Sequence, residues 1–130
     1  MISNIPFFLS SVQAGFPSPA DDYSEQNLNL HDYVVKRPSS TYFVKAHGTS
    51  MTGVGIQDGD ILIVDRSLDA YHGAIVIAMV DGRFTCKTFD KYNRRLNPAQ
   101  DGFPSIAMSE DCVITGVVTH SLSHHHVRTC

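Results

Sequence analysis

The chain has 130 residues, which is the usual size of one domain. Hydrophobic residues make up 42% of it and charged residues 18%, values typical of a globular protein, so disorder of the whole chain is excluded. The net charge of −3 argues against a dedicated nucleic-acid binder, which carries a basic face, and the sequence has no apolar run of about 18 residues that could span a membrane.

The first residues and the cysteines both indicate the cytoplasm. Met1 to Pro6 has neither a positively charged segment nor a long apolar one, so it does not read as a secretory signal peptide. The three cysteines, Cys86, Cys112 and Cys130, are far apart and odd in number. This arrangement fits reduced thiols better than a disulfide framework, so we expect a cytoplasmic protein.

Residues 1–39 read as an extended N-terminal arm. Two prolines in Gly15–Pro19 fix φ and bias the preceding residues toward extended conformations, which excludes a regular helix there. A short helix is predicted from Leu28 to Val35, because Leu30, Tyr33 and Val34 fall on one helical face.

From Ser40 onward the pattern is that of short strands separated by turns. Asp81-Gly82 is a two-residue connection of the kind that favours a type I′ hairpin turn. The fold class is therefore mainly β, with residues 40–130 forming a compact domain that curls to protect its edges. The expected strands are Tyr42–Ala46, Ile61–Val64, Ala74–Val80, Arg83–Phe89 and about Val113–Ser121.

Ser50 is a candidate nucleophile in the run Gly48-Thr49-Ser50-Met51. Glycines near a serine let backbone N–H groups turn toward one point, as an oxyanion hole requires, and a loop with Gly53 and Gly55 follows. A serine beside glycine is nevertheless more often a turn residue. Met51 is more readily explained as a packing residue that shapes a pocket than as a reactant.

Lys87 is the more informative residue, because it is the only charge within the strand pattern Phe84–Phe89. Strand alternation places Thr85, Lys87 and Phe89 on one face. On pattern alone the ordinary interpretation is a lysine on the solvent face. The alternative is a lysine kept partly dry, whose neutral amine can take a proton from a serine, as in known Ser–Lys pairs.

Several segments in unbroken order, over roughly residues 10 to 120, resemble the LexA/UmuD family of self-cleaving peptidases. Ser50 and Lys87 are 37 positions apart, which suits that family. The segment Val12–Pro19 is similar to the cleavage segment of the UmuD branch. The other segments that carry the resemblance are Tyr42–Met51, Asp58–Asp65, His72–Ala78 and Asp81–Lys87.

The resemblance implies Ser50 as nucleophile, Lys87 as general base and cleavage between Ala14 and Gly15, with no cofactor or metal. It implies a homodimer, for which the apolar strand Val113–Val118 suits a symmetric contact. It also implies cleavage provoked by a RecA filament on single-stranded DNA, and a cleaved form that serves a UmuC-like error-prone DNA polymerase in the SOS response. The 14 residues before the cut cannot hold a helix-turn-helix domain, so direct operator binding is not expected.

Other interpretations stay open. The chain could be a non-catalytic β module for interaction or dimerisation, or a relative of signal peptidases, against which the lack of a membrane anchor counts. His47 invites a Ser–His pair, yet no carboxylate is evidently placed to orient it. His124 to His126 could bind a metal, although a solvated tail is the commoner reading, and Ser121–Cys130 matches nothing recognisable.

The serine–lysine hypothesis makes a geometric prediction. Ser50 Oγ and Lys87 Nζ should lie within or slightly beyond hydrogen-bond reach, and apolar neighbours should largely bury Lys87.

Overall fold

The computed structural model describes residues 5–8, 11–15 and 25–125. The described part of the chain contains one short α-helix, two 3₁₀ turns and nine strands. In chain order these are β1 (Pro6–Phe8), β2 (Glu25–Asn27), α1 (Leu30–Val34), η1 (Pro38–Ser40), β3 (Thr41–Lys45), η2 (Thr52–Val54), β4 (Ile61–Asp65), β5 (Ile75–Val80), β6 (Arg83–Asp90), β7 (Arg95–Asn97), β8 (Ile106–Ala107) and β9 (Cys112–Leu122).

The chain divides into two compact units, residues 1–36 and residues 37–130. In the first unit β1 pairs antiparallel with β2, so the arm contains strand pairing that its sequence did not suggest. The predicted helix is confirmed as α1, whose N-cap is the side chain of Asn29, which accepts a hydrogen bond from Asp32 N–H at 3.2 Å. Ala14 and Gly15 are exposed, whereas Phe16–Pro19 lie outside the described residues.

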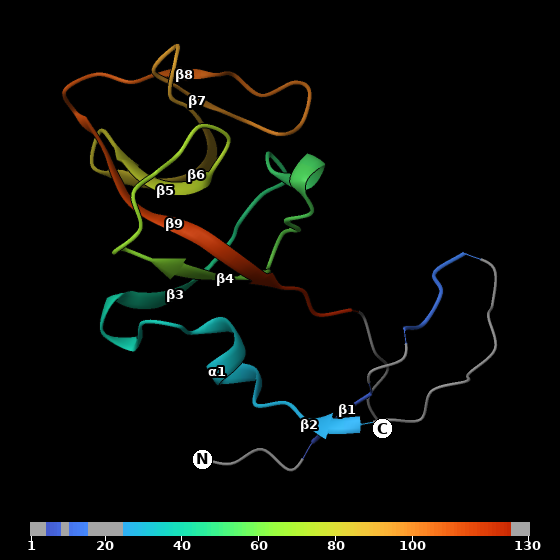
Figure 1. Ribbon diagram of the computed structural model, residues 1–130. Coiled ribbons are helices and arrows are strands. Elements are labelled where there is room, and N and C mark those ends of the chain that lie inside the picture. Colours follow the sequence, from blue (N-terminus) through green and yellow to red (C-terminus); the bar gives the residue numbers. More distant parts are fainter. Residues whose placement is uncertain (1–4, 9–10, 16–24, 126–130) are drawn as a thin grey trace. The chain divides into compact units, whose positions relative to one another are not determined.

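The second unit is built on one antiparallel sheet of seven strands, in the order β3-β4-β9-β5-β6-β7-β8 (Figure 1). This confirms the mainly β fold class. The predicted hairpin is also present: Val80 pairs with Arg83, and the two turn residues Asp81 and Gly82 have φ of 51° and 78°. Positive φ at both positions is the mark of a type I′ turn. No helix in the described part of the chain is long and apolar enough to cross a membrane.

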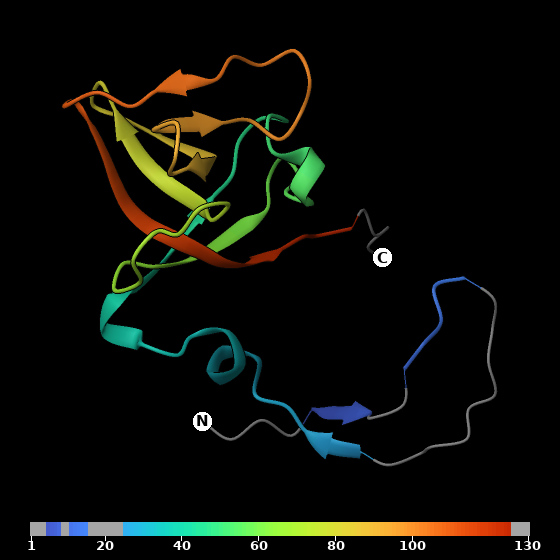
Figure 2. The same ribbon diagram turned by 45° about the horizontal axis from the view of Figure 1, so that its top comes forward.

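The long strand β9 crosses the middle of this sheet (Figure 2). It pairs with β5 from Cys112 to Val117 and with β4 from Val117 to Leu122, and each pairing contains a register shift that bends the strand. Gly116 sits at this bend, where an added Cβ would lie 2.5 Å from Val64 Cγ1. β5 therefore occupies one edge of the first half of β9 and β4 the other edge of its second half, and Val113 in the first half is exposed.

Two hydrophobic clusters pack against β5, because successive strand residues point to opposite faces. Ile77 belongs to one cluster, and its neighbours Val76 and Ala78 belong to the other. The first cluster is completed by Met51, Ile56, Leu62 and Val64, and the second by Ala74, Leu96 and Val117. Leu96 is fully buried and lies in strand β7, Arg95–Asn97.

The sheet curls so far that two distant strands line one pocket. In the sheet order β4, β9 and β5 separate β3 from β6. Residues of β3 and of β6 nevertheless line the same pocket, together with the loop that contains Ser50. The curl predicted from the sequence thus brings the Ser50 loop to the strand that carries Lys87.

Candidate active site

Ser50 lies in the loop between β3 and η2, and the backbone at Gly48 shapes the entry to this loop. Gly48 has φ of 98°, a conformation that favours glycine, and its N–H donates to Asp58 Oδ1 at 2.7 Å. The loop is thereby tied to the turn before β4. The Ser50 side chain is left partly exposed, where a substrate can reach it.

Lys87 points into the protein rather than to solvent. In β6 it pairs with the fully buried Val76 of β5, and only 9% of its surface is exposed. Three oxygens lie 3.1 Å from its Nζ: Ser50 Oγ, Thr85 Oγ1 and the carbonyl O of Cys86. The predicted proximity of Ser50 and Lys87 and the burial of Lys87 are confirmed, and the solvent-face interpretation is wrong.

Burial lowers the pKa of Lys87 below its usual value of 10.5. The Cys86 thiol beside it opposes this shift only in its charged form, and burial raises the pKa of Cys86 to about 11. Within the described residues no carboxylate forms an ion pair with Lys87. The site therefore favours the neutral amine more than water does.

The three contacts of Lys87 satisfy the three N–H donors of an ammonium, and they also accommodate a neutral amine, which has two N–H donors and one lone pair. The carbonyl of Cys86 can only accept, and Thr85 Oγ1 can accept the second N–H. In the structure Nζ donates to Ser50 Oγ at 3.1 Å, and loss of that proton from the ammonium would leave a lone pair facing the O–H of Ser50. This is the arrangement in which a lysine can remove a serine proton.

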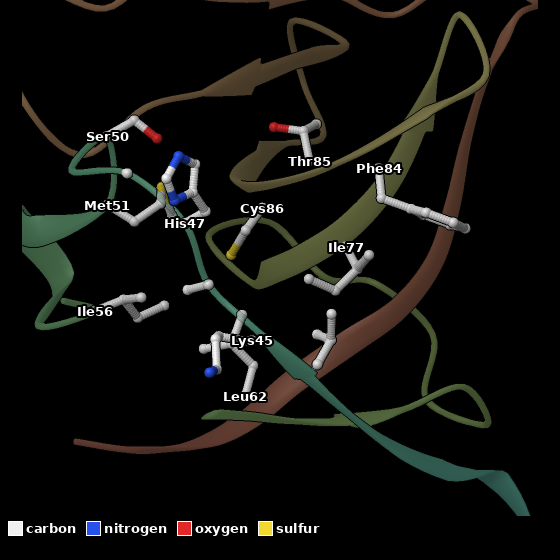
Figure 3. A pocket seen from close by; sticks show the side chains of 13 residues that line it. Lys45, His47, Ser50, Met51, Ile56, Leu62, Ile77, Phe84, Thr85 and Cys86 are labelled. Atoms are coloured by element: carbon white, nitrogen blue, oxygen red, sulfur yellow. The ribbon is translucent and has the colours of Figure 1, made fainter. Parts of the chain in front are cut away.

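A pocket of about 300 Å³ opens beside Ser50. Figure 3 shows the hydroxyl oxygens of Ser50 and Thr85 directed toward each other at one end of the pocket. Its remaining wall is mostly apolar, with Val44, Met51, Ile56, Leu62, Ile77 and Phe84 among the lining residues. Lys45 and His47 also line the pocket, and its mostly apolar wall suits a small apolar side chain next to a bond under attack.

The backbone N–H groups that could stabilise an oxyanion differ in whether they already donate a hydrogen bond. The N–H of Gly48 is already engaged by Asp58, so its predicted role would require that hydrogen bond to open. The N–H groups of Ser50 and Met51 donate no hydrogen bond within the part of the chain that the structure describes. Met51 itself is buried at 4% exposure in the first cluster, which confirms its predicted packing role.

Thr85 is the site residue that sequence reasoning passed over. Alternation placed it on the face of Lys87, and the structure adds that its hydroxyl contacts Nζ. The signal available in the sequence was the spacing of two residues along one strand.

His47 lines the same pocket as Ser50, but no hydrogen bond joins the two side chains within the described residues. The imidazole of His47 is almost fully exposed, and its Nδ1 lies 3.4 Å from Asp58 Oδ1. The expectation that no carboxylate stands beside His47 is therefore wrong, although both side chains are solvated and Ser50 Oγ contacts Lys87 instead. His124 and His125 are exposed, and His126 lies outside the described residues.

The comparisons with known proteins show the family of the chain. The model of a family described as Peptidase S24-like matches residues 6–119, which is most of the chain. The chain belongs to this Peptidase S24-like family. It is 48% identical over 130 residues to Protein MucA of Escherichia coli, covering 97% of this chain and 89% of that protein.

Two other relatives place this S24-like chain within the family. Protein ImpA of Shigella flexneri is 47% identical over 118 residues, covering 88% of this chain and 81% of that protein. The LexA repressor of Listeria innocua serovar 6a is 32% identical over 120 residues, covering 90% of this chain and 58% of the repressor. These matches confirm the resemblance to the LexA/UmuD family of self-cleaving peptidases.

The lowered pKa of Lys87 in this S24-like site has a consequence for stability. The unfolded chain binds the lysine proton more tightly than the folded one, so burying the ammonium costs stability below the folded pKa, and the cost fades as pH rises toward 10.5. Lys87→Met should therefore melt at a higher temperature than the parent at pH 7, and the difference should shrink toward pH 10.5. Calorimetry across this pH range measures it, and a lower melting temperature at pH 7 would mean that the amine is charged and well paired.

Proposed function

We propose that this chain is a self-cleaving serine–lysine peptidase that cuts its own Ala14–Gly15 bond. Ser50 is the nucleophile and Lys87 the general base. Residues 1–39 form the arm that contains the substrate bond, and residues 40–130 form the peptidase domain. The observation that carries the proposal is the contact of 3.1 Å between Lys87 Nζ and Ser50 Oγ, made by a lysine that is 9% exposed.

In the first step neutral Lys87 takes the Ser50 hydroxyl proton while Ser50 Oγ bonds to the carbonyl carbon of Ala14. The negative charge that forms on the carbonyl oxygen needs hydrogen-bond donors at a fixed position. The N–H groups of Ser50 and Met51, which are not engaged elsewhere in the described chain, are suited to this role.

In the second step the bond between Ala14 and Gly15 breaks, and Lys87 returns its proton to the amine of Gly15. Water then adds to the ester at Ser50, with Lys87 again as the base, and Ala14 leaves with a free carboxylate. Small residues on both sides of the bond suit this chemistry, because Ala14 needs only a shallow site and Gly15 lets the two backbones approach closely. The products are residues 1–14 and a body of 116 residues (130 − 14).

The biological role follows from the family resemblance. The chain acts in SOS mutagenesis, and a RecA filament on single-stranded DNA stimulates the cut. The cleaved form is a homodimer that serves as accessory subunit of a UmuC-like error-prone polymerase in translesion synthesis. Its identity of 48% to Protein MucA, against 32% to the LexA repressor, supports the UmuD-like branch rather than a repressor.

The experiment incubates the purified full chain with and without activated RecA filaments and follows its mass. We expect RecA to accelerate the appearance of a fragment that begins at Gly15, and sedimentation of the same preparation to give a dimer. A chain that stays whole at every pH and with RecA would instead support a non-catalytic interaction module.

A further inference from the structure

The loop between β7 and β8, residues 98–105, is hydrogen-bonded to the segment around the nucleophile through Ala99 and Gln100. Ala99 N–H donates to the carbonyl of Ser50 at 2.7 Å, and Gly53 N–H donates to the carbonyl of Ala99, also at 2.7 Å. Both distances are at the short end of the range for N–H···O bonds. A third contact joins Thr52 Oγ1 to Gln100 Oε1 at 2.9 Å. The backbone of Ser50 is thus held from outside its own loop.

Gly53 is a glycine because of this contact. A Cβ at Gly53 would lie 1.9 Å from the carbonyl oxygen of Ala99, far inside any real contact distance. Gly53 does not have the positive φ of Gly48 and Gly55, so its backbone conformation does not require glycine. What excludes a side chain is the close approach of Ala99.

The same segment is joined to the strand of the base. β7 pairs with β6 from Thr88 to Asp90, and Thr88 lies opposite Asn97. Lys87 directly precedes Thr88, and Ala99 is two residues beyond Asn97. The segment Asn97–Gln100 therefore connects the strand of Lys87 with the loop of Ser50, although β3 and β6 are separated by three strands in the sheet.

We propose that Asn97–Gln100 is a positioning strap that holds Ser50 at bonding distance from Lys87, and that Gly53 is required because the strap contacts it. None of these residues touches the reacting atoms. The proposal rests on the proposed serine–lysine function, and it adds that the rate of that reaction depends on a loop outside the dyad. A displacement of about 1 Å in a reacting group can cost on the order of 10²-fold in rate.

The test is Gly53→Ala in the full chain, compared with the parent. The added methyl must push Ala99 and Ser50 apart, so we expect self-cleavage at least about tenfold slower. With Ser50 displaced, water reaches Lys87, and its pKa should return toward the usual value. The rate should then reach half of its maximum at a higher pH, which a general loss of stability would not produce in the folded protein. Burial raises the pKa of the nearby Cys86 thiol to about 11, so this thiol ionises at a higher pH than Lys87.

The matched control is Gly55→Asn in the same loop, where φ is 87° and no atom lies within 4 Å of an added Cβ. Asparagine tolerates this conformation, so this variant should cut at nearly the parent rate. Should Gly53→Ala fail to fold, Thr52→Val tests the strap without added bulk. This variant loses the contacts of the hydroxyl with Gln100 Oε1 and with the carbonyl of Thr49, which should slow the cut about threefold, and Thr52→Ser should restore the rate.

Parent-like rates and pH profiles in Gly53→Ala would overturn the strap and leave the peptidase standing. If Thr52→Val cuts at the same rate as the parent, the strap proposal is also overturned. If the parent never cuts itself, the proposed function fails and the strap is judged by an NMR titration of Lys87. A higher pKa in Gly53→Ala than in the parent would support the strap, and an unchanged pKa would overturn it.

Discussion

Ser50→Ala is expected to remain whole under every condition in which the parent chain cuts itself. The substitution removes the oxygen that attacks Ala14, and the loss of a nucleophile lowers rates by at least about 10³-fold. The fold should survive, because Ser50 lies in a loop and belongs to neither hydrophobic cluster. Mass spectrometry over days, with the melting temperature as the check on folding, measures the effect.

Lys87→Ala should fail in the same way, because no other base contacts Ser50 Oγ in the described part of the chain. His47→Ala, whose side chain is solvated, and a chain that lacks residues 124–130 should both cut like the parent. If Lys87→Ala still cleaved while Ser50→Ala did not, the nucleophile would stand and the assignment of the base would fall.

The second prediction with a large expected effect concerns the rate of self-cleavage as a function of pH, measured without RecA or metal. Lys87 works as a base only when it is deprotonated, so the rate should rise about tenfold per pH unit until pH reaches the lysine pKa. Burial lowers that pKa below 10.5, so the rate should level off before pH 10.5. Between pH 7 and about 10 the rise should be large, and it should follow the fraction of neutral amine.

The position of the plateau identifies the base. A rate that levels off near pH 7 and keeps this profile in Lys87→Ala would indicate a histidine, whose ordinary pKa is about 6.5, and would contradict the role of Lys87. A RecA filament should raise the rate most at neutral pH, where few molecules are deprotonated and competent. Initial rates from mass spectra at a series of pH values give the profile.

Much of the sheet could be predicted because the sequence patterns that indicate its strands and turns lie within short stretches of the chain. Asp81-Gly82 between two apolar runs determines the β5–β6 hairpin, and that hairpin fixes which residues share a face with Lys87. The strands β7 and β8 were not predicted, because segments of three and two residues are too short to show alternation. The pairing of β1 with β2 was missed for the same reason.

The environment of each site residue depended on contacts that are distant in sequence. Alternation places Lys87 on a face, but only the closed sheet decides whether that face is dry. Gly53 was noticed as a flexible loop residue, whereas the structure gives a different reason for it, the carbonyl of Ala99. Asp58 beside His47 was missed because two loops bring them together. Contacts made when two loops come together leave no local pattern in the sequence.

The pairing of β1 with β2 affects what happens after the proposed cut. The Ala14–Gly15 bond lies in the connection between these strands, and in the part of the arm that the structure describes the strand pairing covers Pro6–Phe8 and Glu25–Asn27. While the bond is intact, the connection keeps β1 near β2 at an effective concentration on the order of millimolar. Once it is cut, residues 1–14 must bind as a separate molecule, and a pairing of two such short strands is marginal even within one chain. Dilution then removes the fragment, and the edge of β2 that β1 had occupied becomes free to pair with another strand.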